Sequence, residues 1–240
     1  MNLIFLDTET TGNDVVKDRL VQVCYKLRDE KPKVEYFKAP LPMSVKAMSI
    51  THITDKMLAE KDSFETSQMR KDLEFLLAGG VLVAHNAKFD VAMLEAEGVK
   101  VSRFICTLRV ARFLDAKNLI PEYNLQFLRY YMGLEIEGNP HDAEGDVNVL
   151  VAVFERLYKK ILEVENPPAG GEEVVINKMI EISSKPSLFT FFNFGKYKDK
   201  KIEEVVKTDR GYLEWLLNQK TIDGGMDEDW IYTLKYYLGK

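Results

Sequence analysis

Two carboxylates stand directly after the first apolar run of the chain. Asp7 and Glu9 follow residues Leu3 to Leu6, and side chains two positions apart on a strand point to the same face. Two unpaired carboxylates aimed at one spot repel each other unless a cation lies between them. An Asp-x-Glu triplet is usually solvated surface, but its position at the end of a buried strand makes this one a better candidate for a metal site.

Two further segments supply the other candidate residues. Asp90 lies one turn into a helix expected after the apolar strand Val81 to Ala84, and Asp146 lies in the first turns of a long helix. Each could instead complement the dipole of its helix. The dipole does not explain His141, which follows Asn139-Pro140 in a loop and is free to approach a reacting water.

Taken together, the three segments predict phosphodiester hydrolysis with two divalent cations. One ion would activate the attacking water and the other would stabilise the leaving 3′ oxygen, the two lying ~3.5–4 Å apart. His141 would take the proton from the water. Ligation by oxygen alone favours Mg²⁺ or Mn²⁺ over Zn²⁺.

The elements that must position these residues predict an α/β protein. Three consecutive strands are followed by alternating helices and a strand, which favours a mixed sheet flanked by helices. Strands are expected at Leu3–Leu6, Leu20–Leu27, Val34–Phe37 and Val81–Ala84. Helices are expected at Thr66–Leu77, from an N-cap at Asn86 through Leu94, and at Thr107–Leu114, Leu125–Met132 and Ala143–Leu162.

Composition narrows the class of protein. The 240 residues include 33 basic and 38 acidic ones, a net charge of −5, which argues against a passive nucleic-acid coat protein. The two cysteines, Cys24 and Cys106, form no metal-binding pair and are expected to be buried in a protein of the reducing cytosol. No apolar run approaches the ~18 residues that a membrane span needs. We therefore expect a cytoplasmic protein with no membrane partner.

The motifs resemble a known family, the DnaQ-like DEDDh 3′→5′ exonucleases. Its three motifs match FLDTETTG, AHNAKFD and HDAEGD in order, across residues 1–165. The resemblance implies a ribonuclease H-like fold and release of 5′-mononucleotides from 3′ ends. It also implies that Asp7, Glu9, Asp90 and Asp146 bind the two cations, that His141 is the general base, and that Thr10 lies against the terminal nucleotide.

The C-terminal part resembles the exodeoxyribonuclease X branch of this family. The segments KPSLFTFFNFGKYKDKK and GYLEWLL carry the likeness, so we expect a linker at 166–185 and a small α+β module at 186–240. Two departures from that branch are Thr51-His52 in the segment AMSITHITDKML and Asp199 in the lysine-rich turn. The resemblance favours DNA over RNA as the substrate and repair as the setting.

Aromatic residues and lysines alternate in this C-terminal segment. Such interleaving is typical of single-stranded nucleic-acid binding, and Lys196 and Lys198 are the candidate substrate contacts. The phenylalanines are better interpreted as the core of the module. His85 is interpreted as a packing residue, and His52 as a surface residue.

Two other functions stay open from the residues alone. One is an RNA 3′-end trimming exoribonuclease, because no residue identifies the 2′-hydroxyl. The other is a non-catalytic nucleic-acid-binding protein, which the aromatic and lysine-rich segment would suit. The full set of five catalytic positions and the net acidity argue against the second.

Overall fold

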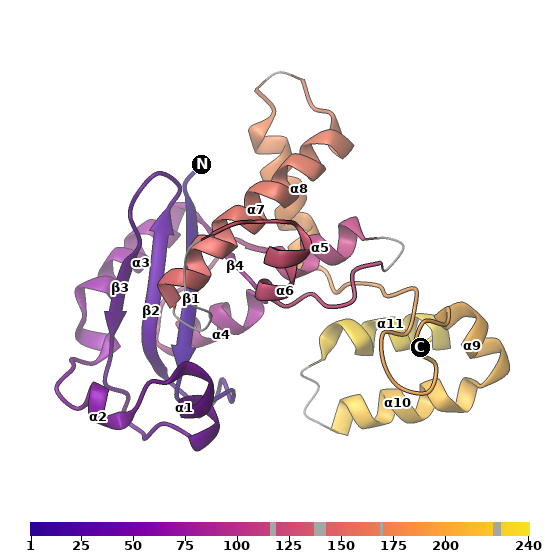
Figure 1. Cartoon of the computed structure of the whole chain (residues 1–240), viewed down its shortest axis with the longest axis horizontal. Coiled ribbons are helices and arrows are strands. Elements are labelled where there is room, and N and C mark those ends of the chain that lie inside the picture. Colours follow the sequence, from indigo (N-terminus) through magenta and orange to yellow (C-terminus); the bar gives the residue numbers. More distant parts are fainter. Residues whose placement is uncertain (116–118, 137–142, 169, 223–226) are drawn as a thin grey trace.

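A five-stranded sheet organises the N-terminal part of the chain. In the computed structural model, which describes residues 1–115, 119–136, 143–168, 170–222 and 227–240, the strand order is β3-β2-β1-β4-β5. β1 pairs antiparallel with β2 and parallel with β4, so the sheet is mixed (Figure 1). The strands are β1 (Leu3–Thr10), β2 (Leu20–Leu27), β3 (Lys33–Tyr36), β4 (Val81–Ala84) and β5 (Phe104–Cys106).

Alternate residues of β1 enter two separate cores. Leu3 and Phe5 pack into the cluster that α5, α6, α7 and α8 cover, whereas Ile4 and Leu6 pack into the cluster that α3 and α4 cover. This is the period of two that a strand buried on both faces requires. The helices around the sheet are α1 (Val45–Thr51), α2 (Asp55–Leu58), α3 (Gln68–Gly79), α4 (Lys88–Ala96), α5 (Thr107–Leu114), α6 (Leu125–Tyr131) and α7 (Ala143–Glu165), with a 3-10 turn at Phe64–Thr66.

Most expected elements are present, with shifted ends. β4 and α5 have the predicted bounds, while β1 continues four residues beyond Leu6 and so includes both Asp7 and Glu9. The predicted N-cap at Asn86 is wrong. Asn86 is in the left-handed region at φ 61° and Ala87 is the N-cap residue of α4, so Asn86 turns the chain out of β4 instead of capping the helix.

The expected linker at 166–185 is wrong over most of its length. α8 (Glu172–Ser184) is a helix whose Val175, Ile176 and Met179 are fully buried in the core beside α7 and β5. Pro167 and Pro168 follow the end of α7, and Gly170 and Gly171 precede the start of α8. The division of the chain into two domains stays a prediction, with α8 packed on the first of them.

The C-terminal module is mainly helical. It contains α9 (Ile202–Thr208), α10 (Arg210–Ile222) and α11 (Glu228–Leu238), and its β structure among the described residues is one bridge between Phe191 and Lys201. Phe189 and Phe192 are buried at its centre against Trp230, as the core interpretation predicted. Across the described parts of the chain, the structure has no helix with the length and apolar character of a membrane span.

A buried ionic cluster joins the module to the N-terminal part. Asp229 at the start of α11 pairs with Arg109 at 3.3 Å and with Arg112, and it accepts a hydrogen bond from the Ser187 amide at 2.9 Å. The side chains of Arg109 and Asp229 are only 6% and 7% exposed. Glu228 extends the cluster to Arg109 and to Lys88 on α4, at 2.5 Å each. We call these residues (Arg109, Arg112, Glu228, Asp229) the ionic clasp.

Candidate active site

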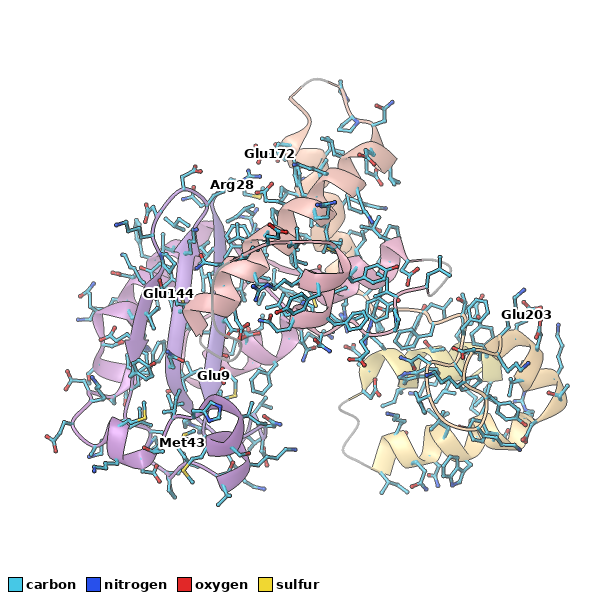
Figure 2. The ribbon with its side chains drawn as sticks, viewed as in Figure 1. Glu9, Arg28, Met43, Glu144, Glu172 and Glu203 are labelled. Atoms are coloured by element: carbon cyan, nitrogen blue, oxygen red, sulfur yellow. The ribbon has the colours of Figure 1, made fainter. Side chains whose placement is uncertain are left out.

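Asp7 and Glu9 emerge from the end of β1 on the face that α7 covers. They are odd-numbered residues of the strand, like Leu3 and Phe5, and so lie on the same face of the sheet. The pairing register with β2 shifts between Glu9 and Thr10. Such an irregularity bends a strand locally and re-aims the side chains beside it. Figure 2 shows Glu9 in the region where β1 ends and Glu144 at the start of α7. The strand therefore directs both carboxylates toward the helix that carries Asp146.

Asp90 approaches the same strand end from the opposite face. It is buried in the first turn of α4, and the Thr8 hydroxyl donates a 2.7 Å hydrogen bond to its Oδ1. Thr8 lies between Asp7 and Glu9 in sequence, so its side chain points to the α4 side of the sheet. Burial raises the pKa of Asp90 to about 7, and the hydrogen bond from Thr8 opposes that rise.

Asp146 is held by a residue that the sequence did not single out. The Gln126 amide on α6 donates a 2.5 Å hydrogen bond to Oδ1 of Asp146, which is buried in the first turn of α7. Asn124 caps α6 by accepting from the Phe127 amide at 2.8 Å, and the cap fixes the helix that carries Gln126. Thr8 lies within the first motif and Gln126 within none, and the sequence assigned neither a role because each acts through a tertiary contact.

Asp7 is close enough to the other three carboxylates for their charges to affect its pKa. Burial raises the pKa of Asp7 well above its usual value, and repulsion from Asp90, Glu9 and Asp146 raises it further. Carboxylates that repel one another in a buried site are the oxygen ligands that a hard divalent cation needs, so the residues fit such an ion. Among the described residues no three potential ligands are already gathered for a single ion. Asp90 and Asp146 each accept a hydrogen bond on Oδ1, from Thr8 and from Gln126.

The remaining predicted site residues lie in different places. His141 falls outside the described residues. Thr10 is buried and its hydroxyl donates to the Gly12 carbonyl at 2.6 Å. Lys196 and Lys198 are exposed on the C-terminal module, where Lys196 pairs with Asp209 at 3.1 Å. The structure therefore gathers the four carboxylates, whereas the two lysines belong to a separate surface.

The loop after β1 is closed by Asp18. Its carboxylate accepts from the Thr11 hydroxyl at 2.7 Å and from the Asp14 amide at 2.8 Å. A Cβ on Gly12 would lie 2.4 Å from Asp18 Oδ2, so this close approach requires glycine. The loop thereby fixes the end of the strand that carries Asp7 and Glu9.

His85 supports the site without facing a reacting group. Its Nε2 lies 2.7 Å from the Tyr123 carbonyl, which can only accept, and its Nδ1 lies 2.9 Å from the Thr107 hydroxyl. Burial lowers the pKa of His85 to about 4, so the ring is neutral and its Nδ1 accepts from Thr107. The ring links the end of β4 to the segment that precedes α6, in agreement with a packing role. His52 is exposed at the C-terminal end of α1, at φ 59°.

Comparison with known families decides the class. A family model described as Exonuclease matches residues 4–154, and a model described as Exodeoxyribonuclease X-like C-terminal matches residues 192–220. The chain belongs to the exonuclease family. The first match includes all four carboxylates.

Curated relatives agree with this membership. The exonuclease is 30% identical to Exodeoxyribonuclease 10 of Escherichia coli strain K12 over 98% of both chains. It is 32% identical to the DNA polymerase III subunit epsilon of Treponema pallidum, over 62% of this chain and 72% of that protein. The protein is thus a nuclease of the hydrolase class, and the likeness extends through the C-terminal module.

Solved structures share the fold. Exonuclease X in complex with 5′ overhanging duplex DNA aligns with a TM-score of 0.56 and 23% identity, covering 75% of this chain and 99% of that one. E. coli exonuclease I in complex with a dT13 oligonucleotide aligns with a TM-score of 0.56 and 21% identity, over 67% of this chain and 43% of that one. The ribonuclease H-like mixed sheet flanked by helices is therefore the fold of this exonuclease.

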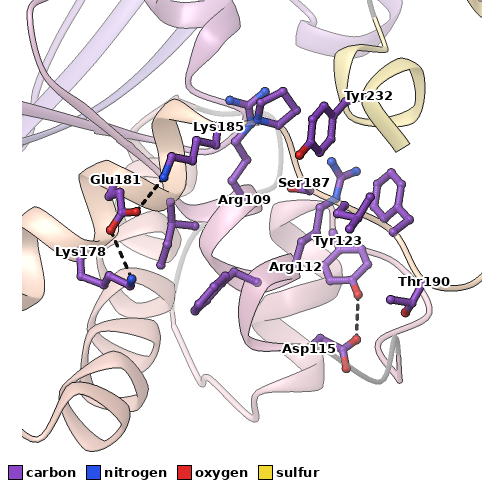
Figure 3. Close-up of a pocket in the computed structure, with 15 residues that line it drawn as sticks. Arg109, Arg112, Asp115, Tyr123, Lys178, Glu181, Lys185, Ser187, Thr190 and Tyr232 are labelled. Carbon is purple, nitrogen blue, oxygen red and sulfur yellow. Dashed lines mark hydrogen bonds and ion pairs between the residues drawn. The ribbon is translucent and has the colours of Figure 1, made fainter. Parts of the chain in front are cut away.

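A separate pocket lies where the exonuclease domain meets the C-terminal module. It has a volume of about 400 Å³ and lies between α5, α8 and the segment 185–190 (Figure 3). Its cations are already paired, Lys178 and Lys185 with Glu181 and Arg112 with Asp229. The pocket contains none of the four carboxylates, so it is not the candidate active site.

Proposed function

We propose that this exonuclease removes nucleotides from the 3′ end of DNA and releases 5′-mononucleotides, using two divalent cations. The observation that carries the proposal is the convergence of Asp7, Glu9, Asp90 and Asp146, whose mutual repulsion is expressed in the raised pKa of Asp7. Four carboxylates that repel one another in a partly buried group are costly to maintain unless cations neutralise them.

The four carboxylates would hold Mg²⁺ or Mn²⁺, because both ions prefer oxygen ligands. A bound pair of cations would supply an activated water and charge stabilisation for the leaving 3′ oxygen. Thr8 orients Asp90 and Gln126 orients Asp146 through the hydrogen bonds described above. Partners of this kind fix the direction in which a ligand carboxylate points.

His141 is proposed as the general base. It precedes α7 by two residues, and α7 carries Asp146 one turn further on. A histidine near its ordinary pKa accepts a proton at neutral pH and returns it to solvent readily. The general base would therefore come from the segment just before α7, the helix that carries the proposed metal ligand Asp146.

Thr10 is proposed to contact the terminal nucleotide through its methyl group. Its hydroxyl proton is already committed to the Gly12 carbonyl. The contact would then be apolar and independent of which base occupies the 3′ end. Such a contact suits an enzyme that removes nucleotides in succession.

DNA is the proposed substrate, and a single strand its proposed form. The similarity to Exodeoxyribonuclease 10 over nearly the whole chain supports DNA. Repair in the cytoplasm is the setting that we propose on the same ground.

The test uses 5′-labelled single-stranded DNA, matched RNA and duplex DNA with a 5′ overhang, each with Mg²⁺, Mn²⁺ or EDTA. A metal-dependent ladder that shortens from the 3′ end, fastest on single-stranded DNA, is the expected result. Faster shortening of RNA would make the protein an exoribonuclease. Intact oligomers in every metal, together with tight binding, would favour the non-catalytic alternative.

A further inference from the structure

An aromatic array runs from the core of the C-terminal module to its surface. Buried Phe192 meets the Tyr212 ring at 5.8 Å, and Tyr212 meets Tyr197 edge to face at 5.0 Å and Trp215 at 5.7 Å. Trp215 lies on α10 and is 54% exposed, although the other tryptophan, Trp230, is 4% exposed. The indole ring is thus anchored from within while half of its surface faces solvent. We call Tyr197, Tyr212 and Trp215 the aromatic array.

The residues one helical turn before and after Trp215 on α10 are small or uncharged. One turn before it on α10 stands Gly211, and one turn after it stand Asn218 and Gln219, both exposed. A Cβ on Gly211 would meet only Asp209 Oδ1, at 3.9 Å, so packing does not require glycine there. The absent side chain leaves open the space beside the indole that a second flat ring would occupy.

The charges near the array leave an excess of cations. Two nearby carboxylates are paired, Asp209 with Lys196 at 3.1 Å and Glu214 with Arg210 at 3.2 Å. A third carboxylate, Asp199, is exposed between Lys198 and Lys200 in the same turn and offsets one of their charges. Within the part of the chain that the structure describes, the exposed Lys198, Lys200 and Lys201 have no recorded ion pair. These lysines belong to the same turn as Tyr197, whose ring lies 4.8 Å from the Lys196 ammonium. A chain with a net charge of −5 therefore concentrates free positive charge beside its exposed aromatic rings.

We propose that the aromatic array binds single-stranded nucleic acid, with a base stacked on Trp215 and the phosphates held by Lys198 and Lys200. Stacking on an exposed aromatic ring combined with lysine contacts to phosphates is how proteins bind single strands without reading sequence. Anchoring through Tyr212 to the core holds the ring in place before binding, which reduces the entropic cost. The array lies within the stretch matched by the Exodeoxyribonuclease X-like C-terminal model.

The inference deepens the proposed function, because it names where the exonuclease would hold the part of its substrate beyond the reacting end. Lys196 then holds Tyr197 and Asp209 in place through its ring contact and ion pair. The phosphate contacts are made by Lys198 and Lys200. This reassigns one of the two lysines that the sequence suggested.

Binding is measured on the full chain in EDTA, from the anisotropy of a labelled oligothymidylate and from tryptophan fluorescence. Oligothymidylate is expected to quench the fluorescence, since Trp215 is the exposed indole. Trp215→Ala should weaken binding roughly 5- to 150-fold and remove the quenching. Lys198→Ala and Lys200→Ala should each lower the slope of log K against log salt by about 0.7.

A further variant separates binding from folding. Gly211→Gln adds a side chain beside the indole at a position where nothing clashes, and it replaces the poorest helix former other than proline. It should unfold at the same or a higher denaturant concentration than the wild type and still bind more weakly. Phe75→Ala removes an 82% exposed ring on α3 and should leave binding unchanged. The pair Lys159→Ala and Lys160→Ala on α7 provides the same control for charge.

The proposal would be overturned if the Trp215 and Gly211 variants bound with wild-type affinity and oligothymidylate did not quench the fluorescence. A protein would then be the alternative ligand of the array. The outcome is separable from that of the proposed function. Nucleotide release without quenching would retain the exonuclease and reject the array. Quenching without nucleotide release would retain the array as a binding site and reject the proposed exonuclease activity.

Discussion

The energetics of the site are set by a few side chains that oppose one another. Asp7 is half-buried and is repelled by three other carboxylates, two of which accept hydrogen bonds from Thr8 and Gln126. Cation binding would convert the repulsion into ligation. Two predictions concern single residues of this group.

The first prediction concerns the pH dependence of stability. The pKa of Asp90 rises from 3.8 to about 7 on folding, so the folded protein binds a proton that the unfolded chain has released in this interval. The free energy of unfolding of the metal-free protein should therefore fall as the pH rises from about 4 to about 7, by up to roughly 1.4 kcal/mol per pH unit from this group. Above that interval, added Mg²⁺ should stabilise the protein more than it does below.

The measurement is urea unfolding in EDTA across this pH range, for the wild type and for Asp90→Asn. The variant keeps an oxygen for the Thr8 hydroxyl but carries no titrating carboxyl. Its unfolding free energy should depend less steeply on pH. Parallel curves for the two proteins would show that Asp90 does not titrate in this interval.

The second prediction concerns Thr8. Thr8→Val keeps the shape of the side chain and removes the hydroxyl that donates to Asp90. Loss of such a supporting hydrogen bond costs roughly 10- to 100-fold in metal affinity. The Mg²⁺ concentration for half-maximal rate should rise accordingly, while Thr66→Val, which alters an exposed hydroxyl, should leave it unchanged. An equal requirement in both variants would remove Thr8 from the support of the metal site.

At the scale of elements, the sequence predicted the strands and helices whose residues are set by local propensity, and it missed contacts between elements. The bounds of β4 and α5 were predicted from the sequence, and the motifs indicated the four carboxylates whose charges meet at Asp7. The partners Thr8 and Gln126 escaped prediction because they meet Asp90 and Asp146 only after helices pack on the sheet. α8 was missed because its Pro- and Gly-rich approach suggested a longer break.

The third prediction concerns the junction between elements. Asp229→Ala should leave Arg112 without its ion-pair partner and Arg109, which is 6% exposed, with Glu228 alone. It should also leave the Ser187 amide without its acceptor. Breaking one side of a buried ion pair costs about 3–5 kcal/mol. Urea unfolding should show this loss, and proteolysis should increase in the segment 185–188.

Its control is Glu203→Ala, which removes an exposed pair with Lys207 and should change neither measurement. Equal stability of the Asp229 and Glu203 variants would mean that the ionic clasp does not fasten the module.

At the scale of the whole molecule, α8 packs into the core of the N-terminal part of the chain. Its Val175, Ile176 and Met179 are at most 1% exposed, and burial of such side chains contributes about 1.5–3 kcal/mol each. The sum is comparable to the total stability of a domain. The fourth prediction is that a fragment of residues 1–188 folds cooperatively, whereas a fragment of residues 1–168 is expanded or aggregates. Circular dichroism and size-exclusion chromatography make the comparison, and a well-folded shorter fragment would restore the boundary at 165.

The most direct test of the central claim is the turnover of Asp7→Asn on 5′-labelled single-stranded DNA with Mg²⁺, measured beside the wild type. Asp7 is the carboxylate on which the other three act, and the amide is nearly isosteric with it. We predict a rate at least about a thousandfold lower, the loss of several kcal/mol of charge stabilisation, in a protein that is at least as stable as the wild type in EDTA. Wild-type turnover in the folded variant would contradict the account, because the four carboxylates would then not form the metal site of this exonuclease.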